Sequence, residues 1–389
     1  MKVVLTVSSI EDESAGPSYT VPALGEALQS AGVDVELHTL REVPARKWPY
    51  PVRTYWRSHL PLIRYLCWSP DMLRGFKAAA KTADIIHVNG VWQLADIYPG
   101  RAVRGTRCKV VYCPRGGLSP TALWRGNTLV KKLMWYLGGQ RRALREAAMF
   151  HAASVKEYEE IRALGFRQPV AIVPNGIEVP ELAHRPFATA NRKLVFFGRL
   201  HVTKAADHLV AAWGCVAAEF PEWSLEIAGP DCGALPQLKA MVAEGRIPRV
   251  TFAGELKGRA KYEFLANADL YALPSLTENF GITIAEALAC GTPVIASKGC
   301  PWPGILGEGK GEGEGRCGWW IDVGAEPLER CLRDALKTAP EALEAMGKVG
   351  RAWMERDYTW AGVGRKMKDA YRWLVTGGEK PKEVYVLHS

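Results

Sequence analysis

The sequence predicts an α/β protein with two doubly wound parallel-sheet domains joined by a hinge. The chain has 389 residues, more than one ordinary hydrophobic core accommodates. Both halves alternate short, continuous apolar runs with helical patterns, which is typical of a parallel sheet covered by helices on both faces. A turn-rich segment separates the two series. Two such domains are expected to bind a ligand in the cleft between them, at the carboxyl ends of their strands.

Six apolar runs predict the strands of the first domain, and five helical patterns fill the intervals. The strands are expected at 2–8, 33–39, 84–88, 109–113, 148–152 and 170–173. The helices are expected at 19–31, 71–82, 93–103, 128–146 and 155–164. The first run begins close behind Met1 and is too short for a signal peptide.

The second domain repeats this alternation. Its strands are expected at 193–197, 224–228, 250–253, 269–272, 293–296 and 318–321. Its helices are expected at 205–219, 234–245, 259–266, 281–290 and 327–337. A final amphipathic helix is expected at 358–375, and the Gly/Glu-rich stretch 307–315 reads as a surface loop.

The join between the domains begins at Pro174-Asn175-Gly176 and continues to about residue 192. It is rich in turn formers and lacks periodicity, as a hinge should. We therefore expect a first domain at 1–178, a second at 179–355 and a C-terminal segment at 356–389.

Composition and charge narrow the class of protein. No run approaches the roughly 18 apolar residues that a membrane-spanning helix needs. The nine cysteines have no Cys-x-x-Cys spacing, which favours reduced thiols in a cytoplasm. The net charge of +9 lies entirely in residues 1–180, with 24 Lys and Arg against 15 Asp and Glu. This asymmetry favours an anionic partner for the first half, although a merely solvated basic face is the plain alternative.

The segment 277–288, TENFGITIAEAL, is the most informative part of the chain. Glu278 lies in a polar turn, and Glu286 lies inside the apolar start of a helix. Gly281 allows a tight bend between them, so that backbone amides at the helix start face an anion. Two carboxylates around an anion site suit a nucleotide-sugar, with a phosphate between two sets of hydroxyls. The alternative is an ordinary helix start with acidic residues near its positive end.

Two cations follow the first strand of the second domain. Gly198 and Arg199 leave that strand, and Lys204 comes five residues after Arg199. A departing diphosphate needs its charge neutralised, which Arg and Lys on one loop provide. Without the rest of the sequence, Arg199 and Lys204 are equally consistent with two solvated cations.

The first domain offers loops at three strand ends. Gly16 lies in Ser14-Ala15-Gly16-Pro17-Ser18, where backbone can approach a ligand. The segment HVNGVW contributes His87, Asn89 and Trp92, and PRGGL contributes Arg115. A lone histidine at a strand end is more often packing than catalytic. The sequence has no Asp-x-Asp and no clustered His/Cys set, so a metal is not indicated. The turn that contains Gly16 is neither a Walker motif nor G-x-G-x-x-G, so it does not indicate ATP or NAD.

Nine segments in order resemble one enzyme family. They are AGPSYTVPALGEALQSAGVDVELHT, HVNGVW, PRGGL, HAASVKEYEEIRALGF, VPNGIEV, FFGRLHVTK, AGPD, LPSLTENFGITIAEALACGTPVIAS and CGWWID. The chain resembles retaining glycosyltransferases of family 4, the group that builds bacterial surface polysaccharides such as lipopolysaccharide, capsule and exopolysaccharide. The resemblance implies the GT-B fold, with two Rossmann-like domains and a C-terminal helix that returns to the first domain.

The resemblance also implies roles for individual residues. Arg199 and Lys204 would hold the donor diphosphate, Glu278 the donor sugar and Glu286 the ribose. The backbone of Asn279, Phe280, Gly281, Ile282 and Thr283 would cradle sugar and phosphate, with Gly198 leading into the cation loop. Leu256 would meet the base, and Gly16 would close on the phosphate. His87, Asn89, Trp92 and Arg115 would face the acceptor. Many members have histidine where this chain has Arg115, which puts a histidine-based role in doubt.

The implied reaction is glycosyl transfer with retention, from a nucleotide-sugar to a lipid-linked or oligosaccharide acceptor, without a cofactor or metal. Two other classes stay open: a nucleotide-sugar epimerase of the same fold, and a non-catalytic sugar-nucleotide-binding relative. Nucleic acid is not an expected partner, because no nucleic-acid-binding motif occurs. The expected location is the cytoplasm, peripheral on the inner face of the membrane.

Two stretches interleave basic and aromatic residues, as an interfacial helix does. The first is 125–145, and the second is 46–57. They predict that the first domain docks on an anionic membrane surface. The alternative is that the rings face the core and the cations are solvated.

Overall fold

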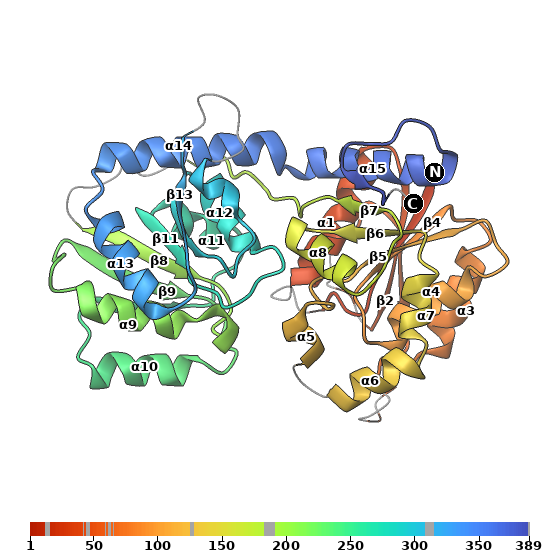
Figure 1. Cartoon of the computed structure of the whole chain (residues 1–389), viewed down its shortest axis with the longest axis horizontal. Helices are drawn as coiled ribbons and strands as arrows, with labels where there is room; N and C mark the ends of the chain where they lie inside the picture. The colour runs from red at the N-terminus through yellow and green to blue at the C-terminus, as the bar shows by residue number, and fades with distance from the viewer. Residues whose placement is uncertain are drawn as a thin grey trace. The chain divides into compact units, whose positions relative to one another are not determined.

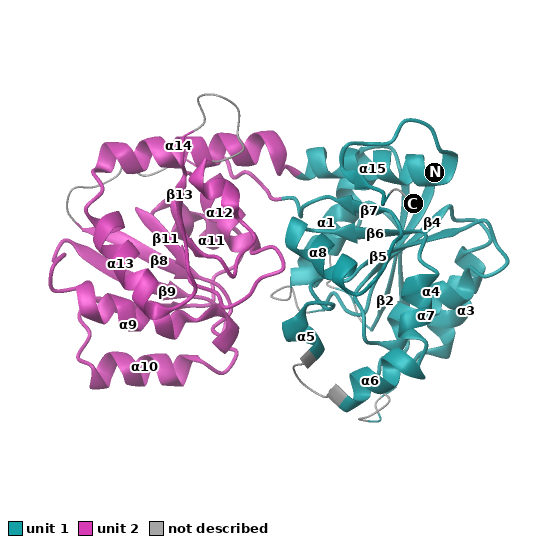
Figure 2. Ribbon diagram, viewed as in Figure 1, with its two compact units in different colours: residues 1–176, 360–389 teal, residues 177–359 magenta. Residues whose placement is uncertain are grey.

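We describe the chain from a computed structural model, which describes residues 1–11, 16–41, 43, 47–58, 60, 64, 66–124, 128–182, 191–307 and 315–387. The chain divides into two compact units (Figure 2). Unit 1 comprises Met1–Gly176 and Trp360–Ser389, and unit 2 comprises Ile177–Thr359. The expected loop at 307–315 lies largely outside the described residues.

Unit 1 is built on a sheet in which the described residues form eight strands, in the order β14-β7-β6-β5-β4-β1-β2-β3. The strands are β1 (Lys2–Val7), β2 (Asp34–Leu40), β3 (Val52–Tyr55), β4 (Ile85–Asn89), β5 (Lys109–Cys113), β6 (Met149–Ala152), β7 (Val170–Ile172) and β14 (Val384–Tyr385). All neighbours pair in parallel except β14, which runs antiparallel to β7. The central strands are almost wholly buried, as their mainly apolar sequences predict.

The helices of unit 1 pack on this sheet in two groups (Figure 1). They are α1 (Gly16–Ser30), α3 (Pro70–Ala79), α4 (Leu94–Ala102), α5 (Pro120–Trp124), α6 (Thr128–Tyr136), α7 (Gln140–Arg145), α8 (Val155–Ala163) and α15 (Trp360–Thr376). α1 packs against α15, whereas α3 and α7 pack against α4. Gly364 makes this first contact close, because a Cβ there would lie 2.6 Å from the Ala27 carbonyl oxygen.

Unit 2 is built on a fully parallel sheet with the order β10-β9-β8-β11-β12-β13. The strands are β8 (Arg192–Phe197), β9 (Trp223–Ala228), β10 (Val250–Gly254), β11 (Leu270–Leu273), β12 (Val294–Ser297) and β13 (Gly318–Ile321). The helices are η1 (Val202–Lys204), α9 (Ala206–Val216), α10 (Leu235–Glu244), α11 (Gly258–Ala266), α12 (Ile282–Ala289), η2 (Pro303–Leu306), α13 (Ala325–Leu336) and α14 (Pro340–Asp357). α9 packs with α10 and α13, and α12 packs with α11 and α14.

Several elements differ from the sequence-based prediction. The expected helix 128–146 is two helices, because Gly139 is left-handed with a φ of 90°. The sequence did not predict helices α5 and α14, the short turns η1 and η2, or the strands β3 and β14. The run 46–57 is also not an interfacial helix: its described part contains β3, and Tyr50 is buried with its hydroxyl on the Pro22 carbonyl.

Candidate functional site

The loop that leaves β8 carries both predicted cations of unit 2. Gly198 is buried, and the side chain of Arg199 is exposed and forms no ion pair within the described part of the chain. Lys204 ends the turn η1 and is only 16% exposed. Gly229, in the loop after β9, lies against the backbone at the start of this segment. Only glycine allows this contact, because a Cβ there would lie 1.9 Å from the Gly198 carbonyl oxygen. One cation is therefore held in place and the other is free to meet a ligand.

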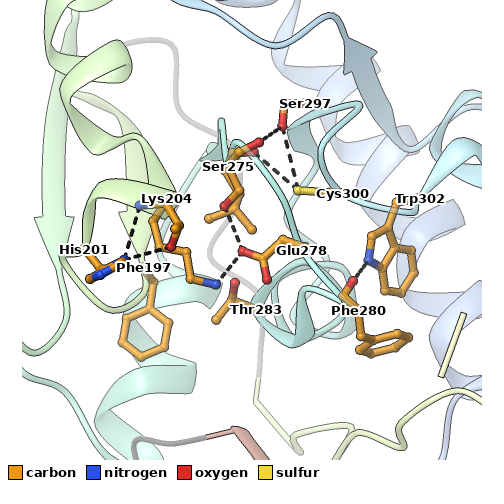
Figure 3. A network of polar contacts seen from close by, with 12 residues as sticks. Phe197, His201, Lys204, Ser275, Glu278, Phe280, Thr283, Ser297, Cys300 and Trp302 are labelled. Atoms are coloured by element: carbon orange, nitrogen blue, oxygen red, sulfur yellow. Dashed lines mark hydrogen bonds and ion pairs between the residues drawn. The ribbon is translucent and has the colours of Figure 1, made fainter. Parts of the chain in front are cut away.

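Glu278 is the partner that holds Lys204 (Figure 3). Its carboxylate forms an ion pair with the Lys204 ammonium and accepts a hydrogen bond of 2.8 Å from the Ser275 hydroxyl. Its backbone N–H donates to the Gly299 carbonyl at 2.9 Å, and Leu276 N–H donates to Thr203 O at the same distance. The loops after β8, β11 and β12 are thus tied together at one edge of the sheet.

Helix α12 begins directly beside this pair. Gly281, the residue before the helix, has a φ of 80°, which glycine adopts without strain. The Trp302 indole N–H donates to the Phe280 carbonyl and fixes the bend, as Figure 3 shows. The backbone N–H groups of Gly281, Ile282 and Thr283 donate no hydrogen bond to other described residues. They offer an anion the positive end of a helix.

Side chains around the helix start fix its orientation. The Tyr271 hydroxyl lies 2.6 Å from the Thr283 hydroxyl and 3.0 Å from the Phe197 carbonyl oxygen. Phe280 is buried and its ring packs against Trp302, with centroids 5.1 Å apart. Asn279 is half-buried in the turn before the helix. The structure therefore brings the predicted residues 278–283 and Lys204 to one place.

Glu286 lies one turn further into α12 and is 3% exposed. Burial raises its pKa, and the Lys261 ammonium, 2.6 Å from its carboxylate, opposes that shift. Lys261 comes from α11, so a hydroxyl that binds Glu286 would have to share or displace this ion pair. Leu256 is half-buried in the turn between β10 and α11.

In unit 1, the predicted residues gather at the carboxyl ends of β4 and β5. Arg115 follows β5 and is half-buried, with a φ of 54°. Its Nε and Nη2 donate to the Asn89 amide oxygen at 3.1 and 2.7 Å. Its Nη1 donates to the Asn175 amide oxygen at 2.6 Å. The guanidinium thus spans the last residue of β4 and the loop that follows β7.

Two of the expected acceptor contacts need correction. His87 is fully buried: its Nδ1 accepts from the Tyr371 hydroxyl at 2.7 Å, and its Nε2 lies 3.3 Å from His151 Nδ1. Asn89 is 3% exposed, and its amide N–H groups go to the Thr6 and His87 carbonyls. Neither side chain is placed to touch an acceptor. They support Arg115 and the sheet instead.

Trp92 and Gly16 are both at least partly exposed at the surface of unit 1. The Trp92 indole N–H donates to the Gly117 carbonyl at 2.6 Å, and its ring lies 5.7 Å from that of Trp135. Part of the ring stays exposed, so stacking on a sugar remains a prediction. Gly16 is the exposed first residue of α1, and Ser14 and Ala15 lie outside the described residues.

One group in the described part of the chain has ligand atoms close enough for a metal: His87, Cys113 and His151, all buried and within 4.8 Å of one another. The facing nitrogens of the two histidines already contact each other, and His151 Nε2 bonds the Val173 carbonyl. Burial lowers the pKa of His151 to about 3, and the charge of Arg115 adds to that effect. Positive charge at this place favours a neutral hydrogen-bonded histidine pair over a bound cation.

Sequence reasoning missed several residues that shape the site. Lys261, Trp302 and Ser275 surround the Glu278–Glu286 segment, and Asn175 and Glu157 surround Arg115. Ser275 follows β11 and Trp302 follows β12, so both lie in loops at the carboxyl edge of the sheet. That position could have identified them as candidate site residues. Lys261 had no such signal, because only the packing of α11 on α12 brings it to Glu286.

Comparison with known proteins identifies both units. Residues 15–176 match the model described as "Glycosyl transferase 4-like domain", and residues 182–353 match "Glycosyl transferases group 1". D-inositol 3-phosphate glycosyltransferase of Segniliparus rotundus is 29% identical over 54% of this chain and 48% of its own length. Phosphatidyl-myo-inositol mannosyltransferase of Mycobacterium leprae is 29% identical over 54% of each chain. The chain thus spans about half the length of these relatives.

Solved structures share the fold over nearly the whole chain. Sucrose-phosphate synthase of Thermosynechococcus elongatus has a TM-score of 0.75 at 22% identity, covering 97% of this chain and 100% of that one. Anabaena HepE, solved with UDP and glucose, has a TM-score of 0.73 at 17% identity, covering 95% and 99%. WaaG, from lipopolysaccharide biosynthesis, has a TM-score of 0.70 at 16% identity, covering 97% and 100%. At these identities the likeness establishes the fold alone.

Proposed function

We propose that this chain, which belongs to the family 4 glycosyltransferases and has the GT-B fold, transfers a sugar from a nucleotide-sugar to an acceptor hydroxyl. The observation that carries the proposal is the grouping of Lys204, Glu278 and the start of α12 at one sheet edge. It combines a held cation, a carboxylate and unpaired backbone N–H groups. These suit a diphosphate and the hydroxyls of the sugar attached to it.

The donor is a nucleoside diphosphate sugar. In this proposal Arg199, Lys204 and the α12 amides hold the two phosphates, and Glu278 accepts hydrogen bonds from the sugar. Glu286 binds the ribose, and Leu256 lies against the base. Support comes from the HepE structures with UDP and UDP-glucose and from a relative described as GDP-mannose-dependent.

The reaction proceeds with retention at the anomeric carbon. The acceptor oxygen attacks from the face that the phosphate leaves, and the departing phosphate oxygen takes the acceptor's proton. Arg199, Lys204 and the helix start stabilise the charge that forms on that phosphate. In this proposal Glu278 binds hydroxyls of the donor sugar and does not act as a nucleophile at the anomeric carbon.

The stereochemistry gives one test. An α-linked donor is expected to yield an α-linked product, because substitution takes place on one face of the sugar. The anomeric proton signal of the purified product, read by NMR, decides the outcome. A β-linked product from an α-linked donor would reject this mechanism.

The metal requirement gives a second test. We propose that the protein's own cations and amides neutralise the diphosphate, so most of the activity should survive excess EDTA. Initial rates with and without chelator, and after adding Mg²⁺ or Mn²⁺, measure this. Loss of activity in EDTA that either metal restores would contradict the proposal.

The proposed acceptor is lipid-linked or an oligosaccharide of bacterial surface polysaccharide, at the inner face of the cytoplasmic membrane. The support is a surface on α6. Leu129, Leu133, Tyr136 and Leu137 are 54–80% exposed and fall on one helical face, whereas Met134 is buried. Lys132 lies on the same exposed face, and α7 adds exposed Arg141 and Arg145. No helix in the described residues is long and apolar enough to cross a membrane.

This α6 surface is expected to dock on an anionic bilayer, with apolar side chains at the acyl boundary and cations at the headgroups. Each cation near the surface contributes about 1 kcal/mol, which fades with salt. The measurement is co-sedimentation with anionic and neutral vesicles at low and high salt. Replacing Leu129, Leu133 and Leu137 with serine should weaken binding on the order of tenfold or more.

The matched control is Val323→Ser, which changes an exposed apolar residue of unit 2. It should leave vesicle binding unchanged. Equal and salt-insensitive binding to both kinds of vesicle, or binding to neither, would remove the membrane role.

A further inference from the structure

Arg115 is a cation that the described residues orient and do not neutralise. It follows β5, and its guanidinium is held between the amide oxygens of Asn89 and Asn175. A guanidinium has five N–H bonds, and these contacts use three of them. The other two make no hydrogen bond to any described residue.

The acid beside Arg115 does not compensate its charge. Glu157, from α8, is 1% exposed. Its two carboxylate oxygens accept from the backbone N–H groups of Gly116 and Ala153, at 2.7 and 2.8 Å. Arg115 forms no ion pair with any carboxylate in the described ranges. Glu157 shapes the loop rather than pairing with the cation.

Holding the guanidinium this way has a cost that a purely structural side chain would avoid. Arg115 adopts the left-handed backbone region, with a φ of 54°. A half-buried cation without a counter-charge loses hydration that neutral amides replace only in part. Burial lowers the pKa values of His87 and His151, and the charge of Arg115 adds to that effect, so these neighbours stay neutral.

We propose that Arg115 is the binding site for an anionic group of the acceptor, a phosphate or a carboxylate. The planar guanidinium keeps two N–H bonds for a ligand, and oxyanions match that geometry better than neutral hydroxyls do. The acceptor class is therefore phosphorylated or acidic, such as a lipid-linked phosphate or a uronic acid residue. This inference rests on the proposed glycosyltransferase function.

The test uses the arginine Nε–H signals of the full chain in ¹H–¹⁵N NMR, with Arg115 assigned by Arg115→Lys. Inorganic pyrophosphate and glucuronate are the probes, and glucose is the neutral control. The titration is repeated with saturating UDP or GDP. Arg115 should shift saturably with at least one anion, also with the nucleotide present. If Arg115 responds only to the nucleotide, or to no anion, the proposal is wrong.

Asn175→Asp separates ligand binding from a merely structural role. It keeps an acceptor for Arg115 Nη1 and adds the missing negative charge. A structural Arg115 would be at least as well held and would bind the probe no worse. We expect instead at least tenfold weaker anion binding with an unchanged melting temperature. Unchanged binding in this variant would overturn the proposal, and Arg74→Gln, an exposed surface arginine, is the control.

The same spectra report on the donor site through Arg199. A nucleotide-induced shift of Arg199 without any response of Arg115 to the anions would reject the Arg115 site and leave the proposed function intact. If the signals of neither Arg115 nor Arg199 shift with any probe or nucleotide, both the Arg115 site and the proposed function are rejected.

Discussion

Replacing Lys204 with alanine should lower turnover on the order of 10²-fold or more, because it removes charge preorganised at the departing diphosphate. Lys204 is only 16% exposed and is fixed by Glu278. A cation from solvent is therefore not expected to replace its charge in the alanine variant. Arg199→Ala should act in the same direction. Steady-state kinetics with a saturating acceptor and a varied nucleotide-sugar measure the effect.

The control for this loss is Lys193→Ala, which removes another half-exposed lysine of unit 2, paired with Glu226. It should leave turnover near that of the wild type. Melting curves of all three variants check the fold, and Glu278 keeps its Ser275 hydrogen bond when Lys204 is absent. Near-normal turnover in both cation variants, with native melting, would remove the assignment of the donor site.

Gly229→Ala should destabilise unit 2 and disable the cation loop together. Gly229 has a φ of 136°, and a Cβ would lie 1.9 Å from the carbonyl oxygen and 2.7 Å from the carbonyl carbon of Gly198. Both are backbone atoms of the residue before Arg199, so the loop itself must move. Strain and overpacking together cost about 2–5 kcal/mol.

Calorimetry and kinetics on Gly229→Ala measure the two effects. For a unit of this size the melting temperature should fall by roughly 5 °C or more. Gly233→Ala is the control, because Gly233 also has a positive φ, of 99°, but no atom lies within 4 Å of its Cβ. That variant has only the backbone cost. Equal losses in the two variants would show that the contact with Gly198 is unimportant.

The sequence predicted the central strands, and it predicted that the Lys204 loop and the Glu278 turn lie at one sheet edge. Strands such as β1 and β8 contain continuous apolar runs because they are buried on both faces. Glu278 and Lys204 were predicted as neighbours because parallel strands bring the loops at their carboxyl ends to one edge. The structure joins them by an ion pair.

The missed elements depended on tertiary contacts. Helix α14 contains Gly347 and Gly350, which weaken a local helical pattern. A Cβ at Gly347 would lie 2.0 Å from the Gly291 carbonyl oxygen, so this glycine allows the close packing. His87 was expected to face an acceptor, although a lone histidine at a strand end is more often packing, and the structure buries it. Its partner Tyr371 lies 284 positions along the chain.

The central claim is that unit 2 binds the diphosphate of a nucleotide-sugar, and thermal-shift measurements with nucleotides test it most directly. UDP and GDP, the matching monophosphates and free sugars are compared on the wild type and Lys204→Ala. At about 100 times its dissociation constant, one diphosphate should stabilise the wild type by roughly 2.7 kcal/mol. That shift should be largely lost in Lys204→Ala and absent with monophosphates at the same concentration. No shift with any diphosphate, or an equal shift in the variant, would contradict the account.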